Sequence, residues 1–340
     1  MIRTNPEVAE ALASGRPVVA LETAAVTHGL PRIGPVGIPG FELPASIASD
    51  STPAAVRTAF APNVPLHRAL GHALVAAVRA EGAVPATVGF LHGELVIGLT
   101  SDELDELADA PDPVKVSARD AGLAAARGSS GGTTVAGTVL ACTLAQPARI
   151  RVFATGGIGG VHRGFASLPD VSADLHAIRD GGALVVSAGA KSILDLPATV
   201  ETLDTLGVPV VGLGTRNFPR FLSEGDATLP TGAADLAHDP ADAARIFAMS
   251  RRFLPDRGML LCVPPPASDA IPTAEMEAAI AAGLAECARR GIRGASVTPA
   301  LLASVATASG GRSLATNLGV LVQNARIGAR VARALAESPP

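Results

Sequence analysis

The chain has few lysines and few aromatic side chains. Only two of its 27 basic residues are lysines, Lys115 and Lys191, and it contains neither Trp nor Tyr. Aromatic residues fill 3% of the 340 positions, which leaves little surface on which nucleic-acid bases could stack. The formal net charge of -4 also argues against a basic nucleic-acid-binding face. No nucleic acid is therefore expected among its partners.

Long apolar runs and a disulfide framework are missing as well. No uninterrupted apolar stretch reaches the roughly 20 residues of a transmembrane helix, and the segment after Met1 lacks the apolar core of a signal peptide. The three cysteines, Cys142, Cys262 and Cys287, are odd in number and scattered, which is typical of reduced thiols in a protein core. We expect a cytoplasmic protein with no membrane contact.

The sequence does contain an alternation of apolar strands and amphipathic helices. With 48% hydrophobic residues, the chain can bury a large core. Helical patterns separate most of the predicted strands, which are 17–22, 86–91, 94–97, 113–117, 149–154, 183–188, 208–212 and 259–263. The tail is predicted to be helical over 273–290, 299–308 and 314–337. This alternation predicts an α/β fold with three layers, α/β/α, in which helices flank a central mixed sheet, and residues 1–340 are expected to form a single domain.

The first sixty residues combine regular elements with a long irregular segment. Asn5 can cap a helix that starts at Pro6, and the following strand finishes on Glu22 before a predicted turn at 27–31. Residues 32–63 are rich in Pro, Gly, Ser and Ala and show no sustained helical or alternating pattern. Their length exceeds the roughly 12–15 residues of ordinary loops, which predicts an insert. Whether it is a lid, an interface arm or a disordered stretch stays open.

The two lysines point to amine chemistry. Arginine stays protonated in proteins, whereas a lysine amine can lose its proton and attack a carbonyl. Lys191 follows the apolar stretch 184–190, and burial at a strand end would lower its proton affinity and favour imine formation. The alternative is a lysine at a helix start whose ammonium reaches solvent. Lys115, beside Arg119 and Asp120, either binds a phosphate or forms a surface ion pair.

Two glycine-rich segments are candidates for ligand binding. Residues 128–138 lead into a predicted helix, where backbone amides and the helix dipole could hold a phosphate, although the Gly-Lys-Ser/Thr ending of a Walker loop is absent. Residues 155–164 follow a strand, but His162 stands where a dinucleotide-binding fingerprint needs its third glycine. His162 and Arg163 are predicted to orient a substrate; the alternative for Arg163 is a structural hydrogen bond.

Two aspartates follow this second segment. Asp170 and Asp174 are four residues apart and would share one face if they lay in the first turn of a helix. There they would complement the helix dipole, with Asp170 or Ser172 as the cap. The sharper alternative is a divalent metal, because hard cations prefer carboxylate and water oxygens. No cluster of His and Cys in the sequence supports a zinc site.

Several blocks, in the same order along the chain, resemble the pseudouridine-5'-phosphate glycosidase family, which includes the proteins called indigoidine synthase A. The resemblance covers most of the chain outside 32–63, and its strongest blocks are 20–23 with 28–31, 81–87, 153–164, 172–175 and 188–195. The family reversibly cleaves the C–C bond between ribose 5-phosphate and C5 of uracil, and by convention it is placed among the carbon-oxygen lyases. It opens the sugar ring and forms an imine between a lysine and C1', which acts as an electron sink.

The resemblance implies a role for each matching residue. Lys191 matches the imine-forming nucleophile and Glu22 the proton donor, while Asp170 matches the ligand of a divalent metal, usually manganese, held largely through water. The implied partners are ribose 5-phosphate and a uracil-like or other planar base, and the implied assembly is a homotrimer. The substrate-binding residues that it implies are Lys115, Thr134, Val135, His162, Ser172, Ala173, Asp174 and Asn317.

The chain departs from the family pattern at three places. Thr-Ala-Ala-Val follows Glu22 where the family has Ser-Thr-Ile-Ile, residues 263–267 read Val-Pro-Pro-Pro-Ala in place of Asn-Pro-Ile/Val-Pro-Glu, and 32–63 is the third departure. The last two favour, as an alternative, a C-glycosynthase that joins ribose 5-phosphate to another ring in natural-product biosynthesis. A second alternative is a non-catalytic sugar-phosphate binding protein, although binding alone would not require Glu22, Asp170 and Lys191 together.

Overall fold

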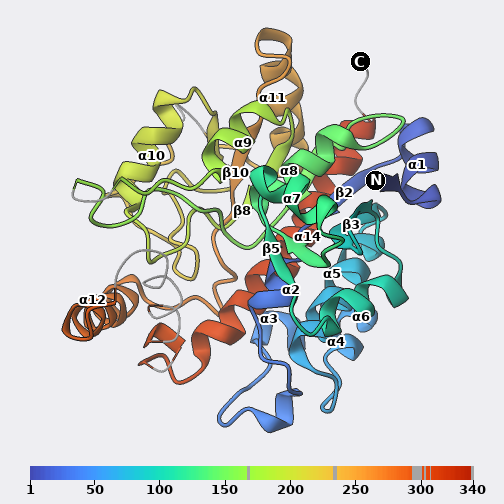
Figure 1. Ribbon diagram of the computed structural model, residues 1–340. Helices are drawn as coiled ribbons and strands as arrows, with labels where there is room; N and C mark the ends of the chain where they lie inside the picture. The colour runs from blue at the N-terminus through green and yellow to red at the C-terminus, as the bar shows by residue number, and fades with distance from the viewer. Residues whose placement is uncertain (167–168, 233–235, 293–300, 302–303, 307, 338–340) are drawn as a thin grey trace.

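The fold is built on one sheet, in which the described part of the chain forms ten strands (Figure 1). The computed structural model describes residues 1–166, 169–232, 236–292, 301, 304–306 and 308–337. Eight strands lie in the order β1-β4-β3-β2-β7-β8-β10-β9, while β6 pairs with β3 and β5 pairs with β6. The strands are β1 (Ile2–Thr4), β2 (Val18–Leu21), β3 (Val84–Leu91), β4 (Glu94–Ile97), β5 (Val114–Val116), β6 (Gly131–Thr133), β7 (Val152–Ala154), β8 (Leu184–Ser187), β9 (Val210–Gly212) and β10 (Met259–Cys262).

The sheet contains both parallel and antiparallel pairs. β2 pairs in parallel with β3 and β7, and β8 pairs in parallel with β7 and β10. In contrast, β3 pairs antiparallel with β4 and β6. The parallel neighbours β2, β7, β8 and β10 present their carboxyl ends along one edge, where α/β proteins commonly bind ligands. The predicted mixed sheet is confirmed.

Helices cover both faces of the sheet. On β2, Val18 and Ala20 belong to one hydrophobic core and Val19 and Leu21 to another, because successive side chains of a strand point to opposite faces. The predicted three-layer α/β/α arrangement is therefore confirmed. The first core includes side chains of α1 (Pro6–Ala13), α8 (Val135–Leu144), α9 (Asp174–Asp180), α10 (Leu196–Thr205) and α12 (Thr273–Arg289), and the second those of α5 (Leu66–Ala80), α11 (Pro240–Phe253) and α14 (Arg312–Glu337), which is red in Figure 1.

All of the predicted strands are observed, β4 with the predicted bounds and the others with shifted ends, but β1 and β6 were not predicted. Each is three residues long, and β6 is mostly glycine, so no apolar side chains mark it in the sequence. Its glycines permit close contact: a Cβ on Gly131 would lie 2.2 Å from the carbonyl oxygen of Val114, and one on Gly132 would lie 2.2 Å from Thr27 Oγ1. Part of the first glycine-rich segment is therefore a strand.

The predicted turn at 27–31 begins inside a helix, α2 (Ala24–His28), so that prediction is wrong at its start. The helix begins directly after Glu22 and Thr23. The other helices of the first half are α6 (Ser101–Asp109), the short 3-10 helix η2 (Ala118–Asp120) and α7 (Ala121–Ala126).

Residues 32–63 pack against the rest of the molecule. They contain the 3-10 helix η1 (Pro35–Gly37) and the short helices α3 (Ala45–Ala48) and α4 (Ala54–Ala59). Ile47 and Val56 are fully buried in the core shared with α5 and α14. This burial excludes the disordered alternative for the segment, while the lid and the interface arm stay open.

The predicted helices over 273–290 and 314–337 are confirmed as α12 and α14, and the helix predicted over 299–308 falls largely outside the described residues. Within the described ranges, no helix combines the length and the apolar character needed to span a membrane. Cys142, Cys262 and Cys287 are buried free thiols, as predicted.

Candidate active site

Three polar side chains follow neighbouring strands at the carboxyl edge of the sheet. Glu22 comes directly after β2, Thr155 directly after β7, and Lys191 a short turn after β8. These strands are adjacent and run parallel, so their ends bring the three residues to the same edge. The predicted proton donor and the predicted nucleophile therefore meet at one place in the fold.

The Glu22 carboxyl is partly buried and hydrogen-bonded. Thr155 Oγ1 donates to Glu22 Oε1. Burial raises the pKa of Glu22 above its ordinary value, and the positive charge of Lys191 and the hydrogen bond from Thr155 oppose that rise. The net direction is upward, so the carboxyl is biased toward the protonated form that a proton donor needs.

The turn that carries Lys191 is held by the second glycine-rich segment. Lys191 N donates to the Ile158 carbonyl oxygen at 3.1 Å, and Ala190 forms a bridge with Ile158. Leu194 N donates to the Lys191 carbonyl oxygen at 3.0 Å, which closes the turn. The alternative of a lysine at a helix start is wrong, because α10 begins only at Leu196.

Arg163 makes structural hydrogen bonds, which was one of its two predicted roles. Its Nε donates to the carbonyl oxygen of Leu194 at 3.1 Å and its Nη2 to that of Ser192 at 3.2 Å. The guanidinium also pairs with Glu277, with 3.1 Å between Nη2 and Oε2. Arg163 therefore secures the turn that follows Lys191.

Lys115 approaches the same charges from another part of the sheet. It lies in the middle of β5, and the register pairs it with Gly132 of β6. Burial and the positive charge of Lys191 lower the pKa of Lys115, while the negative charges of Glu22 and Asp174 oppose that change. Lys115 is therefore coupled electrostatically to Glu22 and Lys191.

The surface ion pair considered for Lys115 is formed by another residue. Asp120 pairs with the adjacent Arg119, with 3.5 Å between Oδ1 and Nε, and its Oδ2 accepts from Ser117 N at 3.1 Å. Asp120 thus completes the capping box of η2, and Arg119 makes the ion pair with it that was considered for Lys115.

Asp174 ties the two glycine-rich segments together. Its Oδ1 accepts from Ala136 N at 3.0 Å, at the start of α8, and its Oδ2 accepts from Gly159 N at 2.8 Å. The residue is only 7% exposed. One amide of the predicted phosphate cradle is therefore engaged by a protein carboxylate, and a substrate-binding role for Asp174 stays a prediction.

Asp170 and Asp174 do not share a helix face, so that prediction is wrong. α9 begins at Asp174, and Asp170 lies before it, where its carbonyl oxygen accepts from His162 N at 3.0 Å. The Asp170 side chain is half-exposed, and His162 Nδ1 lies 3.8 Å from its Oδ2. The two residues thus form a carboxylate and imidazole pair beside the second glycine-rich segment.

Asp170 offers a metal ion one carboxylate with the imidazole of His162 beside it. Within the described residues, no group of three or more His, Cys, Asp and Glu side chains surrounds one point. One carboxylate with a neighbouring imidazole suits manganese, which accepts oxygen and nitrogen ligands and fills its other positions with water. Manganese at Asp170 stays a prediction.

The other predicted substrate-binding residues lie on elements that border this edge. Asn317 is on α14, and a Cβ built on Gly156 would lie 3.4 Å from its Oδ1. Thr134 is the N-cap of α8, and Val135 is buried in its first turn. Ser172 and Ala173 stand directly before α9, and Ser172 Oγ accepts from Asp174 N at 3.2 Å.

Thr155 could not be identified as a site residue from the sequence. Its hydrogen bond to Glu22 depends on β7 lying next to β2, and strand order cannot be read from one sequence. The signal was a polar residue directly after an apolar strand, the same pattern that identified Glu22.

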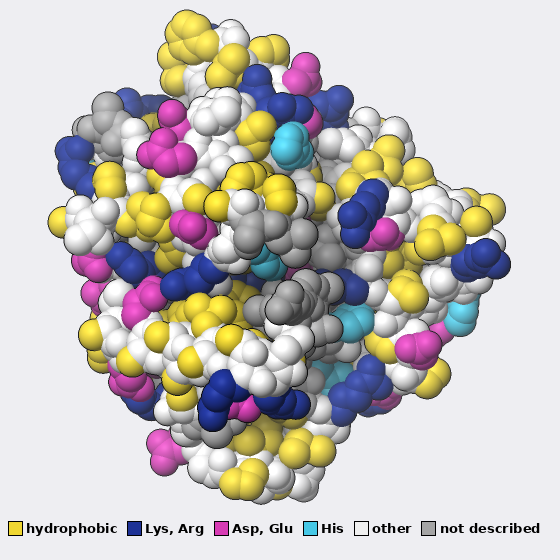
Figure 2. Space-filling view, turned by 60° about the vertical axis from the view of Figure 1, so that its left-hand side comes forward, with side chains coloured by type: hydrophobic (Ala, Val, Ile, Leu, Met, Phe, Trp, Pro, Cys, Tyr) yellow, Lys and Arg dark blue, Asp and Glu magenta, His cyan; other side chains and the backbone are white. Residues whose placement is uncertain are grey.

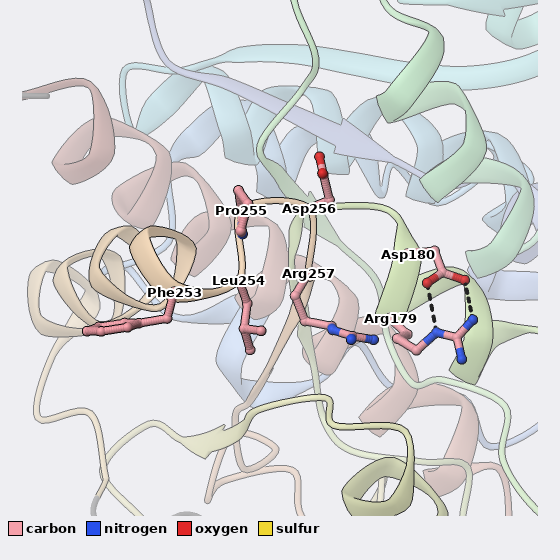
Figure 3. Close-up of a pocket in the computed structure, with 7 residues that line it drawn as sticks. All are labelled: Arg179, Asp180, Phe253, Leu254, Pro255, Asp256 and Arg257. Atoms are coloured by element: carbon pink, nitrogen blue, oxygen red, sulfur yellow. Dashed lines mark hydrogen bonds and ion pairs between the residues drawn. The ribbon is translucent and has the colours of Figure 1, made fainter.

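Figure 2 shows one face of the molecule, and a cavity lies at the edge of the sheet opposite the candidate site. In Figure 2 the visible face is hollowed near its middle, and Lys, Arg and His side chains gather around the hollow, although the net charge is -4. A different cavity of about 460 Å³ lies at the amino ends of the strands, because its lining residues 179–180 and 253–257 precede β8 and β10 (Figure 3). That second cavity is at the wrong edge for Glu22 and Lys191.

Sequence comparison identifies relatives along nearly the whole chain. Residues 47–334 match the family described as "Indigoidine synthase A like protein". The chain is 44% identical to a pseudouridine-5'-phosphate glycosidase of Herpetosiphon aurantiacus, over 98% of this chain and 97% of the relative. It is 40% identical to a protein of the same name from Myxococcus xanthus, over 99% of both chains.

Two solved structures share the fold. The prealnumycin C-glycosynthase AlnA, solved in complex with ribulose 5-phosphate, has a TM-score of 0.81 and 36% identity, with 99% of this chain and 97% of AlnA covered. An indigoidine synthase A-like protein of Thermotoga maritima has a TM-score of 0.77 and 28% identity, with the same coverage. The chain therefore belongs to the family of indigoidine synthase A-like proteins, which its motifs had indicated.

Proposed function

We propose that the chain is an enzyme that reversibly cleaves and forms the C–C bond between ribose 5-phosphate and a planar base. Pseudouridine 5'-phosphate is the default substrate, since relatives at 40–44% identity carry the name of that glycosidase. The single observation that carries the proposal is the hydrogen-bonded Glu22 carboxyl, whose pKa is raised by burial, at the same sheet edge as the strand-end amine of Lys191.

The two residues divide the chemistry between a nucleophile and an acid. In the direction of synthesis, the Lys191 amine condenses with the C1' aldehyde of open-chain ribose 5-phosphate and releases water. The iminium carbon accepts an electron pair from the base, the C1'–C5 bond forms, and C5 loses its proton. The ring-closing sugar hydroxyl then displaces the amine. Cleavage is the reverse, and protonated Glu22 donates the proton to the opening ring or the departing base carbon.

Lys115 is proposed to face the sugar phosphate. Its pKa is lowered by burial and by Lys191, so its ammonium holds its proton less tightly than an ordinary lysine. When protonated, it supplies positive charge close to the reacting centre. Thr134, Val135, His162 and Asn317 are proposed to contact the rest of the substrate, together with Ser172, Ala173 and Asp174.

A metal and an oligomeric state complete the proposal. Asp170 and water would hold a divalent ion, with manganese as the expected metal, which when bound supplies positive charge and ordered water near the substrate. The expected assembly is a homotrimer, for which light scattering should give three times the chain mass of 34.0 kDa. The buried free cysteines support a cytoplasmic setting.

A C-glycosynthase is the second candidate. The Val-Pro-Pro-Pro-Ala sequence at 263–267 and the structural similarity to AlnA favour a ring other than uracil. Both candidates use the same lysine imine and differ in the partner ring.

The test is incubation with pseudouridine 5'-phosphate and, separately, with ribose 5-phosphate and borohydride. Rapid release of uracil supports the glycosidase. Imine trapping without uracil release supports the C-glycosynthase. Binding of ribose 5-phosphate with neither imine nor bond exchange would contradict both and leave a non-catalytic sugar-phosphate binding protein.

A further inference from the structure

One face of α14 holds the loop that follows β7. Asn324 Nδ2 donates to the Thr155 carbonyl oxygen at 2.7 Å, and a Cβ on Gly156 would lie 3.1 Å from Leu321 Cδ2 and 3.4 Å from Asn317 Oδ1. Asn317, Leu321 and Asn324 are spaced as i, i+4 and i+7, so they share a helix face. This face fixes the loop from which Thr155 reaches the candidate active site.

A second face of α14 holds the proline segment, defined here as residues 263–272. Thr316 Oγ1 donates to the Asp269 carbonyl oxygen at 2.6 Å, and Gln323 Nε2 donates to the Pro264 carbonyl oxygen at 2.7 Å. The segment begins where β10 ends, next to the end of β8. It therefore leaves the sheet at the same edge as the turn that carries the proposed nucleophile.

The Asp269 carboxylate connects the insert 32–63 to this second face. Its Oδ1 accepts from Ser46 N at 3.2 Å and from Ser268 Oγ at 3.0 Å, and its Oδ2 accepts from Ser46 Oγ. Gly319 leaves room for the contact, because a Cβ there would lie 2.4 Å from Asp269 Oδ2 and 2.8 Å from Ser46 Oγ. Among the residues that the structure describes, hydrogen bonds rather than an ion pair satisfy this charge.

We infer that Ser46, Asp269 and Thr316 form a positioning junction that sets the specificity for the ring joined to C1'. The insert and the proline segment, two departures from the family pattern, meet at this junction. α14 then transmits its position to Asn317 on the neighbouring face. The inference rests on the proposed function, since it concerns the second substrate of that reaction.

The sugar-phosphate half of the site has further contacts that do not involve α14. Arg163 and Ile158 secure the turn of Lys191, and the pairing of β5 with β6 places Lys115. Loosening the junction is therefore expected to change the fit of the ring and to leave imine formation intact.

The test compares ring affinity with imine formation in Ser46→Ala and Asp269→Asn. With ribose 5-phosphate saturating, the KM for uracil in the synthetic direction should rise about tenfold in each variant, because a charge-assisted hydrogen bond is lost. The fraction trapped by borohydride with ribose 5-phosphate alone should match that of the unaltered chain. Because the two residues share one contact, the double variant should show no more than the larger single effect.

Two further variants keep the test independent of folding. Ser51→Ala removes an exposed hydroxyl of the same insert and should change neither readout. Gly319→Ala reaches the junction from the helix and should reproduce the rise in KM. The inference is overturned if Ser46→Ala and Asp269→Asn have the same KM for uracil as Ser51→Ala. It is also overturned if these two variants lose imine trapping in parallel with the rise in KM. If the unaltered chain forms neither imine nor product, the proposed function fails, and this inference fails with it.

Discussion

Each of the two lysines is placed by a glycine-rich segment, but the contact between lysine and segment differs in the two cases. Lys115 lies opposite Gly132 within the β5–β6 ladder. Lys191 lies in a turn whose backbone donates to Ile158, in a segment that runs along the carboxyl edge of the sheet. The first lysine is fixed on a strand, and the second is held in a turn beside Glu22.

This difference shows that two segments equally rich in glycine can serve different purposes. Gly132 has no room for a side chain, because a Cβ would lie 2.2 Å from Thr27 Oγ1. Gly159 also excludes a Cβ, which would lie 2.3 Å from Ser172 Oγ, but in addition its amide binds Asp174. The first segment packs strands closely, whereas the second organises polar groups around the proposed nucleophile.

The largest expected effect concerns the acid beside the second lysine. Glu22→Gln should lower kcat for cleavage of pseudouridine 5'-phosphate by about 10²–10⁴-fold, because the amide cannot donate the proton. Steady-state assay of uracil release measures it. Glu10→Gln is the matched control, since Glu10 is an exposed acid far from this edge. A loss of kcat similar to that of the control would contradict the role of Glu22.

The packing role of the first segment predicts a loss of stability. Gly132→Ala should lower the free energy of unfolding by about 1–3 kcal/mol, because its Cβ overlaps Thr27 Oγ1. Gly122→Ala in α7 is the control: nothing lies within 4 Å of its Cβ, and alanine favours the helix by about 1 kcal/mol. Urea unfolding measures both. Equal stability of the two variants would refute the packing account.

A charge role for the first lysine predicts a moderate effect on binding. Lys115→Arg should raise the KM for ribose 5-phosphate about tenfold, because the larger, planar guanidinium cannot replace a compact ammonium with a lowered pKa. Imine trapping at saturating sugar should persist. If trapping is lost, Lys115 and not Lys191 is the nucleophile, and the roles of the two lysines are reversed.

The smallest expected effect is on the pH dependence of stability. Burial raises the pKa of Glu22 in the folded state, so the folded chain binds a proton more tightly than the unfolded chain. The stability from this group is complete below the ordinary glutamate pKa and is lost as pH rises through the raised value. In Glu22→Gln, the free energy of unfolding should therefore decrease less as pH rises from the ordinary glutamate pKa through the raised value. Urea unfolding at several pH values measures this. An unchanged slope would contradict the raised pKa.

The sequence was sufficient for the features that depend on single strands. Apolar runs ending in polar residues located Glu22 and Lys191, and the alternation of strands and helices predicted the three layers. Thr155 could not be assigned, since its contact with Glu22 depends on the order of β2 and β7. For Asp174 the sequence left a helix-dipole role, a metal and a substrate open, and it could not show that the carboxylate accepts from amides distant in sequence.

The short elements escaped prediction for a different reason. β6 carries no apolar pattern because its glycines pack against backbone and hydroxyl groups. In 32–63, the helices α3 and α4 are too short for a sustained helical period, and Ile47 and Val56 are buried by contact with distant helices. Tertiary contacts decide such segments.

The central claim is that Lys191 is the imine-forming residue. The most direct measurement is borohydride reduction with ribose 5-phosphate, followed by peptide mass spectrometry that distinguishes the two lysines of the chain. The account predicts a reduced adduct on Lys191, its loss in Lys191→Arg, and its retention in Lys115→Arg. An adduct on Lys115, or one that survives in Lys191→Arg, would contradict it.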